Sequence, residues 1–320
     1  MALADRHTVP PPYACQPSGP AARPLNGDLD SLIQLLKSSP ALPEAVRLAY
    51  TIAFYDQHTG ITEELIGCRL STEGKTSYQT LFEVVEPARG KTILDLACGS
   101  GPAAQPCLAQ IGERGRLLAI DINLRQLQLA SDRFAARNAL FLCAPAQRLP
   151  VRSESVDAVL CHLACMAMVP LEPIVGEIGR VLKPGGLFAA VFGGIEHPAA
   201  LYDQFDSIFW EELHREAPQF RGFGDPRTKT LDGLRSLFPE RLGFAQPLEK
   251  HDFCLVFRER PAALTEAICR FYNAYHLLSA AGRHSLRERA QHLFASQSDN
   301  GDPVTLLAPQ TRITLRKIGA

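Results

Sequence analysis

The sequence has no continuous apolar segment of the roughly 18 residues that a membrane-spanning helix requires. It also has no excess of charge of one sign, since 33 lysines and arginines stand against 34 aspartates and glutamates for a net charge of −1. Proteins that bind nucleic acid usually carry a basic face, so nucleic acid is not an expected partner. The first residues lack the charged-then-apolar pattern of a signal peptide. We therefore expect a soluble, cytoplasmic protein without a membrane partner.

The nine cysteines include no Cys-x-x-Cys pair. An odd number of cysteines in a chain of 320 residues favours reduced thiols over a disulfide framework. Cys98, Cys143 and Cys161 fall on or beside predicted strands, which favours buried, inert thiols. The pattern Cys161-His162-x-x-Cys165 lacks a second ligand cluster elsewhere in the sequence, so we expect no metal.

The chain divides into three parts. Residues 1–27 are rich in proline and predict a disordered leader, with a segment that folds over a ligand as the alternative. Residues 28–90 predict an N-terminal helical cap, because apolar residues recur at helical spacing in three stretches. Residues 91–320 contain the core of the fold. The three helices of the cap are expected at about 29–36, 44–56 and 76–85.

From residue 91 onward, predicted strands and helices alternate. The first five strands are expected at 91–97, 116–121, 139–143, 155–161 and 187–192, with helices at 102–112, 124–137 and 171–181. Several of these strands are apolar throughout, which is typical of a parallel sheet covered on both faces. Repeated strand–helix units with short connections predict an α/β fold with a Rossmann-like, doubly wound, mostly parallel seven-stranded sheet.

This alternation stops after Gly194. A helix at 201–214, a loop at 219–228 and a short helix at 231–238 come next, and we predict a helical lid insertion at about residues 195–245. The remaining elements are strands at 251–259 and 311–318 and helices at 262–279 and 284–295.

The stretch Thr92–Gly101 reads as a buried strand that runs into a glycine turn. The residues from Gly99 to Ala104 satisfy the pattern G-x-G-x-x-G/A, and Asp121 ends the next strand, where an acid binds ribose hydroxyls. NAD and S-adenosylmethionine fit these features equally well. Asp95 separates the two, because a carboxylate before the turn would repel a pyrophosphate but suits the ammonium group of a methionine moiety. A cap for the turn and a tight strand–helix corner are the plain structural alternatives.

Four stretches together resemble the class I S-adenosylmethionine-dependent methyltransferases. Leu94–Gly101 is similar to their first motif, and Ile120-Asp121 followed by Asn123 is similar to the acidic end of their second strand. The others are Leu149-Pro150 with Ser155–Val159, and the turn Leu182–Gly186. The likeness covers roughly residues 80–195. It is strongest to the small-molecule branch that contains the ubiquinone and menaquinone methyltransferases.

This resemblance implies a set of cofactor contacts. Gly99 and Gly101, with Ala97 beside them, would let the backbone approach the methionine part of S-adenosylmethionine, with Asp95 near its amino group. Asp121 would bind both ribose hydroxyls. The remaining positions are Ile122 and Asn123 beside the adenine, Ala146 and Gln147 at its edge, and Tyr55 near the methionine end. The family often has an acid where this chain has Pro145, so adenine N6 must find another acceptor. Core packing is the alternative for Tyr55.

Methyl transfer requires a general base only if the acceptor is a hydroxyl, an amide or a carbon acid. His162 lies just past the fourth strand, at the edge of the sheet where ligands bind in open α/β folds, and is the first candidate for a base. His58 is the second. A core histidine is the alternative for His162.

The acceptor pocket is expected outside the core sheet. Tyr202, Phe205, Phe209 and Trp210 recur at helical spacing, and Tyr272, Tyr275 and His276 follow in a later helix. Of these we predict Tyr202, Phe205, Trp210, Tyr272 and His276 as substrate contacts, with a core stripe as the alternative. Arg221 and Arg227 are candidates to bind an anionic acceptor.

The sequence thus predicts O-, N- or C-methylation of a small metabolite in secondary or cofactor metabolism, with S-adenosyl-L-homocysteine as the second product. An NAD-dependent oxidoreductase and a non-methylating S-adenosylmethionine-binding protein are the alternatives. A base-flipping nucleic-acid enzyme is disfavoured, because no Asn-Pro-Pro-Tyr-like motif follows the fourth strand. A homodimer is left open.

Overall fold

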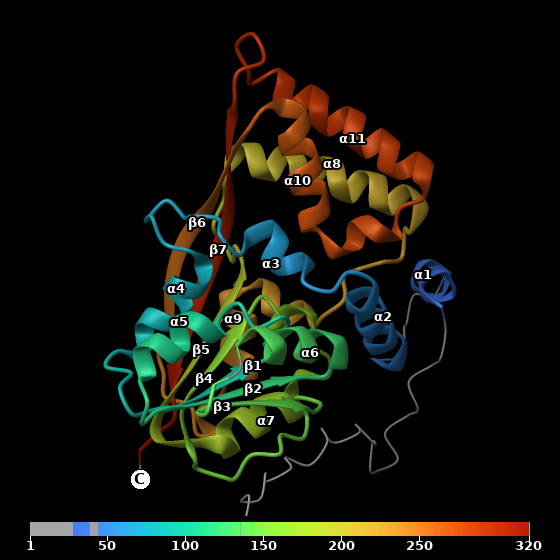
Figure 1. Ribbon diagram of the computed structural model, residues 1–320. Helices are drawn as coiled ribbons and strands as arrows, with labels where there is room; N and C mark the ends of the chain where they lie inside the picture. Colours follow the sequence, from blue (N-terminus) through green and yellow to red (C-terminus); the bar gives the residue numbers. More distant parts are fainter. Residues whose placement is uncertain (1–27, 39–43, 135, 320) are drawn as a thin grey trace, which may run out of the picture.

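The computed structural model describes residues 28–38, 44–134 and 136–319. The predicted leader, residues 1–27, lies outside this range. Figure 1 shows the sheet and its covering helices at one end of the molecule and a group of helices at the other. No helix in the described ranges is both long enough and apolar enough to cross a bilayer.

The core is a seven-stranded sheet with the order β3-β2-β1-β4-β5-β7-β6. β1 to β5 run parallel, and β7 pairs antiparallel with both β5 and β6. The predicted doubly wound, mostly parallel sheet is therefore confirmed. The strands are β1 (Thr92–Leu96), β2 (Arg116–Asp121), β3 (Ala139–Cys143), β4 (Val156–His162), β5 (Leu182–Gly193), β6 (Glu249–Glu259) and β7 (Val304–Arg316).

Alternate residues of β1 point into two different cores. Ile93 belongs to the core on the side of α4, α5 and α6, whereas Leu94 and Leu96 belong to the core on the side of α7 and α9. Helices on both faces explain why the parallel strands are apolar throughout. These helices are α4 (Ser77–Phe82), α5 (Ala104–Ile111), α6 (Leu124–Arg133), α7 (Leu171–Val181) and α9 (Leu231–Leu237), with short 3-10 turns at Glu83–Val85, Cys165–Ala167, Pro226–Lys229 and Glu240–Leu242.

A helical lobe lies beyond the sheet, beside the far ends of β6 and β7 (Figure 1). It consists of α8 (Ala200–Glu216), α10 (Pro261–Phe271), the 3-10 turn η5 (Asn273–Leu277) and α11 (Ala280–Ala295). Fully buried side chains of all three helices, such as Phe205, Ile268 and Phe294, belong to one apolar cluster. Most of this lobe is therefore an insertion between β6 and β7. The segment predicted as a lid, residues 195–245, contributes only α8 to it, while α9 packs against α7.

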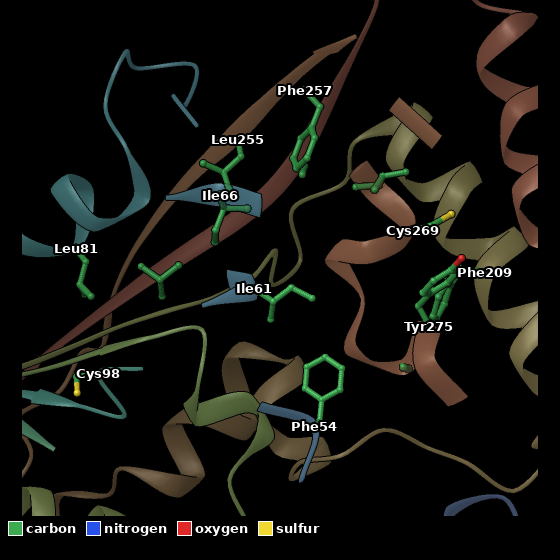
Figure 2. Close-up of a cluster of buried hydrophobic side chains, with 14 of the residues drawn as sticks. Phe54, Ile61, Ile66, Leu81, Cys98, Phe209, Leu255, Phe257, Cys269 and Tyr275 are labelled. Carbon is green, nitrogen blue, oxygen red and sulfur yellow. The ribbon is translucent and has the colours of Figure 1, made fainter. Parts of the chain in front are cut away.

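The N-terminal helices are α1 (Leu29–Ser38), α2 (Glu44–Gln57) and α3 (Ile61–Ile66). Figure 2 shows Phe54 of α2 and Ile61 and Ile66 of α3 in the same buried cluster as Leu255 and Phe257 of β6. The N-terminal segment is thus part of one continuous core with the late strands and the helical lobe.

Several predicted boundaries were wrong. β7 begins at Val304, seven residues before the predicted start. Its first half pairs with β6 in a two-stranded ribbon, which the sequence around Pro309 did not indicate. The turn Lys183–Gly186 is a bulge within β5, since Leu182 pairs with Val156 and Leu187 pairs with Ala158. The helix predicted at 262–279 divides into α10 and η5, and the short α3 was not predicted.

Candidate functional site

One cavity of about 680 Å³ opens at the carboxyl ends of β1, β2, β4 and β5. The N-terminal helices α2 and α3, the start of α8, the loop 220–229 and the segment 270–274 enclose it. Ligands of open α/β sheets bind at this edge, where the strand order reverses between β1 and β4. Among the predicted site residues, those on its wall are Tyr55, Asp95, Ala97, Gly99, Asp121, Ile122, Asn123, Ala146, Gln147, His162, Tyr202, Trp210 and Tyr272.

The glycine turn after β1 requires unusual backbone angles. Ala97, Gly99 and Gly101 have positive φ values of 58°, 55° and 81°. A Cβ on Gly101 would lie 2.9 Å from Ala130 Cβ, so this glycine permits close packing of the turn on α6 and does not line the cavity. A Cβ on Gly99 would meet no atom within 4 Å, which leaves open space for a ligand at that point.

Asp121 organises the turn from the end of β2. Its two carboxylate oxygens each accept a backbone hydrogen bond of 2.8 Å, one from Gly99 N and one from Asn123 N. Burial raises the pKa of Asp121, and these backbone donors act in the opposite direction. Each oxygen has a second lone pair, so the carboxylate can still accept from hydroxyl groups of a ligand in the cavity.

Asp95 is a buried carboxyl group of the site with one unpartnered oxygen. It is 3% exposed, and its Oδ2 atom has no hydrogen-bond partner within the described residues. Burial, and then the nearby charge of Asp121, raise the pKa of Asp95 to about 7. An unpaired carboxylate at this depth is costly, so the site favours a ligand that brings a positive charge or donors to it.

Asn123 holds the N-terminal segment onto the sheet. Its side-chain oxygen caps α6 by accepting from Gln126 N at 3.0 Å. Its amide nitrogen donates to Ile52 O at 3.2 Å and to Asp56 Oδ1 at 3.0 Å. The polar atoms of Asn123 are therefore engaged by the protein, and the adenine contact implied by the resemblance is left to its neighbours.

The predicted adenine edge also lies on the cavity wall. Ala146 and Gln147 follow β3, and the Gln147 amide donates to Val169 O at 3.4 Å. This contact leaves the Gln147 carbonyl oxygen as an acceptor beside the position where the sequence has Pro145.

A contact that the sequence did not indicate ties α3 to the glycine turn. Glu63 Oε2 accepts from Ser100 Oγ at 2.8 Å, and the same carboxylate binds Arg133 of α6 through two bonds of 2.6 and 2.7 Å. The signal that could have indicated α3 is weak, because the helix has six residues and Gly60 precedes it.

The two histidines predicted as bases occupy different environments. His162 is buried on the cavity wall, with Nε2 2.8 Å from Ser77 Oγ and its ring stacked 3.9 Å from the ring of Tyr78. Burial lowers the pKa of His162 to about 3. His58 lies off the cavity, against Phe54, and burial followed by the charge of Arg270 lowers its pKa. Neither environment favours a base that works near neutral pH.

The predicted substrate contacts also separate into two groups. Tyr202, Trp210 and Tyr272 line the cavity. Phe205 of α8 is fully buried, because it faces the lobe core and packs against Phe294 of α11. His276 packs against Phe54 with a ring separation of 5.0 Å. The structure therefore places these last two side chains off the cavity.

Tyr55 connects the two ends of the cavity. Its hydroxyl accepts from Asn273 Nδ2 at 3.3 Å, directly after Tyr272 in the chain. Tyr55 and Tyr78 both line the cavity, and burial followed by the charge of Asp95 raises the pKa of Tyr78. The aromatic end of the cavity is thus continuous with the end at the glycine turn.

One acidic and one basic side chain at the aromatic end of the cavity were not predicted. Asp206 of α8 and Lys229 both line the cavity, and Lys229 Nζ lies 5.6 Å from the centre of the Trp210 ring. Of the two predicted arginines, Arg227 is paired with Asp225 and Glu172, whereas Arg221 bonds only to backbone carbonyls in the described structure.

The described cysteines form no disulfide with one another. Within the same residues, no three His, Cys, Asp or Glu side chains are grouped closely enough to hold a metal ion. The arrangement is therefore one of hydrogen-bonding, ionic and aromatic groups around a single cavity.

Comparison with known proteins places the glycine turn within a known domain. Residues 94–190 match the family model described as a methyltransferase domain. The ubiquinone/menaquinone biosynthesis C-methyltransferase UbiE of Brucella anthropi is 29% identical over 171 residues, covering 51% of this chain and 64% of that protein. The malonyl-(acyl-carrier protein) O-methyltransferase of a Marinomonas species is 32% identical over 114 residues, covering 35% and 42%. The chain spans less than two thirds of the length of these relatives.

Solved structures share the fold. The YcgJ protein of Bacillus subtilis superimposes with a TM-score of 0.52 at 17% identity, over 76% of this chain and 99% of that one. Phosphoethanolamine N-methyltransferase 2 of Haemonchus contortus, solved in complex with S-adenosyl-L-methionine, gives a TM-score of 0.53 at 15% identity, over 88% and 61%. At this level of identity the likeness describes the fold.

Proposed function

We propose that this chain, which matches a methyltransferase domain over residues 94–190, is a class I S-adenosylmethionine-dependent methyltransferase that transfers the methyl group of S-adenosylmethionine to a small-molecule metabolite. The observation that carries the proposal is the pair of carboxylates at the ends of β1 and β2. Asp95 has an oxygen without a partner, and Asp121 has free lone pairs beside the open space at Gly99.

The residues present fit this cofactor. The Asp95 carboxylate would accept from the ammonium group of the methionine part, which relieves its unpaired burial. Asp121 would accept from the ribose hydroxyls, and Ile122, Ala146 and Gln147 would surround the adenine. When bound, the cofactor supplies a methyl group on a positively charged sulfur, which is a good leaving group. The protein then has to orient the acceptor and exclude water.

The acceptor is proposed to be a small molecule with an apolar or planar part. The cavity wall opposite the glycine turn carries the rings of Tyr202, Trp210, Phe220, Phe223 and Tyr272. The relatives support the class, since UbiE is named for ubiquinone and menaquinone biosynthesis. O-, N- and C-methylation are all represented among the names of similar proteins.

Two other functions share the same strand-end geometry. An NAD-dependent oxidoreductase would place a pyrophosphate near Asp95, and the repulsion between the two anionic groups disfavours it. A protein that binds S-adenosylmethionine without methyl transfer is the second alternative.

Titration calorimetry with S-adenosylmethionine, S-adenosylhomocysteine and NADH separates these alternatives. We expect both sulfur ligands to bind and NADH to give no heat. Transfer of a radiolabelled methyl group from S-adenosylmethionine to added small molecules then tests the reaction itself. Binding of NADH alone would overturn the proposal, and binding without transfer to any acceptor would favour the non-methylating alternative.

A further inference from the structure

Three side chains in the aromatic end of the cavity form a hydrogen-bonded chain. The hydroxyl of Tyr272 lies 2.6 Å from the hydroxyl of Tyr202 and 2.8 Å from Asp206 Oδ1. The indole of Trp210, one turn further along α8, lies beside Asp206 and lowers its pKa. All four side chains line the cavity, and none of the three hydroxyl and carboxyl groups was needed to account for cofactor binding.

The direction of the protons in this chain follows from the number of donors. Tyr272 has one hydroxyl proton and two oxygen partners, and an ionised carboxylate can only accept. The proton of Tyr272 therefore belongs to the bond with Asp206, and the proton of Tyr202 occupies the bond between the two tyrosines. The remaining lone pairs of the Tyr202 oxygen are then free to accept from a donor in the cavity.

The surroundings of Asp206 suit a group that takes up a proton. Burial raises the pKa of Asp206, while Tyr272 and Trp210 act against this rise. The charged and titratable groups that face it from the packed elements are Tyr202, Asp203, Tyr272 and Lys229. Burial also raises the pKa of both tyrosines, so they remain neutral hydroxyls that can pass a proton on without becoming phenolates.

The chemistry of the relay indicates what its donor would be. A phenolic hydroxyl has an ordinary pKa of about 10, so it gives up its proton to a relay that ends at a carboxylate more readily than an aliphatic hydroxyl does. The flat rings of Trp210, Phe220 and Tyr272 around the relay suit an aromatic body.

We propose that the acceptor is a planar aryl compound with a hydroxyl group and that Asp206 receives its proton through Tyr202 and Tyr272. This inference rests on the proposed methyl transfer. As the bond between the acceptor oxygen and the methyl carbon forms, the bond between that carbon and sulfur breaks, and its electron pair stays on sulfur. The hydroxyl proton moves to Tyr202, the proton of Tyr202 moves to Tyr272, and the proton of Tyr272 moves to the Asp206 carboxylate.

The single tryptophan of the chain allows a test that does not depend on activity. Because the Trp210 indole lies beside Asp206, its fluorescence should change as this carboxyl titrates. The ring of His214 lies 5.4 Å from Trp210, so the measurement is made in a His214→Gln background to remove a second titration. We expect a transition at a higher pH than that of an ordinary aspartate, which Asp206→Asn abolishes and Asp203→Asn, at the neighbouring exposed acid, retains. A transition that survives Asp206→Asn would overturn the inference.

The reaction itself is tested with three phenols that differ in acidity. Phenol and 1-naphthol are protonated at pH 7.5, whereas 4-nitrophenol is largely ionised and needs no base. For Asp206→Asn we expect kcat with phenol or 1-naphthol to fall by roughly 10²-fold or more, and kcat with 4-nitrophenol to change by less than about tenfold. Tyr272→Phe should behave in the same way, and Asp206→Glu should recover part of the loss.

The possible failures are distinguishable. If the wild-type protein binds S-adenosylmethionine but methylates none of the three phenols, or if Asp206→Asn slows all three equally, this inference is wrong and the proposed function stands. If the wild-type protein does not bind S-adenosylmethionine in calorimetry, the proposed function itself fails. The dissociation constant of S-adenosylmethionine should be the same for the wild type, Asp206→Asn and Tyr272→Phe.

Discussion

The two ends of the cavity are built in different ways. At the glycine turn, the groups that line the cavity come from the ends of β1 and β2. Backbone atoms hold these groups in place, as in the bonds from Gly99 N and Asn123 N to Asp121. At the aromatic end, the groups are side chains from α8, the loop 220–229 and the segment after α10. The first end is fixed by local geometry, and the second by the packing of distant segments.

This difference has a consequence for how each end responds to change. Backbone donors cannot be altered by a side-chain substitution, so the first end should be sensitive only at its two carboxylates and its glycines. The aromatic end depends on hydroxyl and carboxyl groups that substitutions can remove one at a time. The four predictions that follow test this contrast, from the largest expected effect to the smallest.

Asp121→Ala should cause the largest loss of cofactor affinity. The variant removes a charged acceptor for the ribose hydroxyls, with each such bond worth about 1.5–3 kcal/mol, and it releases Gly99 N and Asn123 N. We expect the dissociation constant of S-adenosylmethionine in calorimetry to rise by roughly 10²-fold or more. Asp132→Ala, at an exposed acid of α6, is the matched control. Unchanged affinity in the Asp121 variant would remove the ribose assignment.

Asp95→Asn should stabilise the ligand-free protein while it weakens cofactor binding. In the folded protein Asp95 is protonated below about pH 7, whereas in the unfolded chain it is protonated only below about pH 4. The ionised Asp95 therefore lowers the stability of the folded protein above pH 7, and this loss of stability disappears as the pH falls. The rise in pKa from 3.8 to about 7 corresponds to at most about 4 kcal/mol.

The measurement is thermal unfolding at pH 8 with and without S-adenosylmethionine. Without ligand, the Asp95→Asn variant should unfold at a higher temperature than the wild type. Addition of ligand should raise the unfolding temperature of the variant by less than that of the wild type. In the wild type, the affinity for S-adenosylmethionine should fall as the pH drops below about 7, because binding favours the ionised carboxylate. A variant that is less stable without ligand at pH 8 would contradict the unpaired burial of Asp95.

Substitution of the two glycines of the turn should lower the stability of the protein by different amounts. Gly101→Ala places a Cβ 2.9 Å from Ala130 and 3.0 Å from Phe134 at a φ of 81°, which should lower the free energy of unfolding by roughly 2–3 kcal/mol. Gly99→Ala meets no protein atom within 4 Å and should cost only about 1 kcal/mol for its backbone angle.

Urea unfolding and calorimetry on both variants check this contrast. The Gly99→Ala variant should lose proportionally more affinity for S-adenosylmethionine than stability, since its methyl group enters the open space beside the turn. Equal losses of stability in the two variants would mean that the turn packs on α6 less closely than the structure indicates.

His162→Phe should have the smallest effect of the four, and on stability. The histidine is neutral at all pH values above about 4 because its pKa is about 3, and its one polar contact is with Ser77. Loss of that contact should lower the free energy of unfolding by about 1–2 kcal/mol. A double-mutant cycle with Ser77→Ala measures the coupling of the pair. If His162→Phe instead shifted the pH dependence of methyl transfer, His162 would replace Asp206 as the proton acceptor.

Much of the glycine-turn end could be predicted from the sequence. Thr92–Gly101 is a continuous stretch in which the apolar strand, the acid and the glycines have fixed spacing, and Asp121 follows at the end of the next strand. Parallel strands place such residues at one edge of the sheet whatever the rest of the chain does. The contacts with Glu63 of α3 were missed, because that helix has six residues and little periodicity.

Prediction was less successful at the aromatic end. The period of α8 indicated a stripe of rings, but the sequence could not say which of them would face the lobe core. Phe205 turned inward against Phe294, while Trp210 and Tyr202 reached the cavity. Asp206 drew no attention in the sequence, because a lone acid on an amphipathic helix is usually a solvated residue.

The sequence by itself determined the doubly wound, mostly parallel sheet and the two acids that end β1 and β2. These depend on local spacing and on strand periodicity, which short stretches of sequence carry. Only the tertiary structure decided that the insertion between β6 and β7 brings Tyr272 within 2.8 Å of Asp206, since the two residues are 66 positions apart and meet through packing of α8 with α11 and η5. The proposed cofactor site is thus a property of a motif, and the proposed acceptor site is a property of the assembled fold.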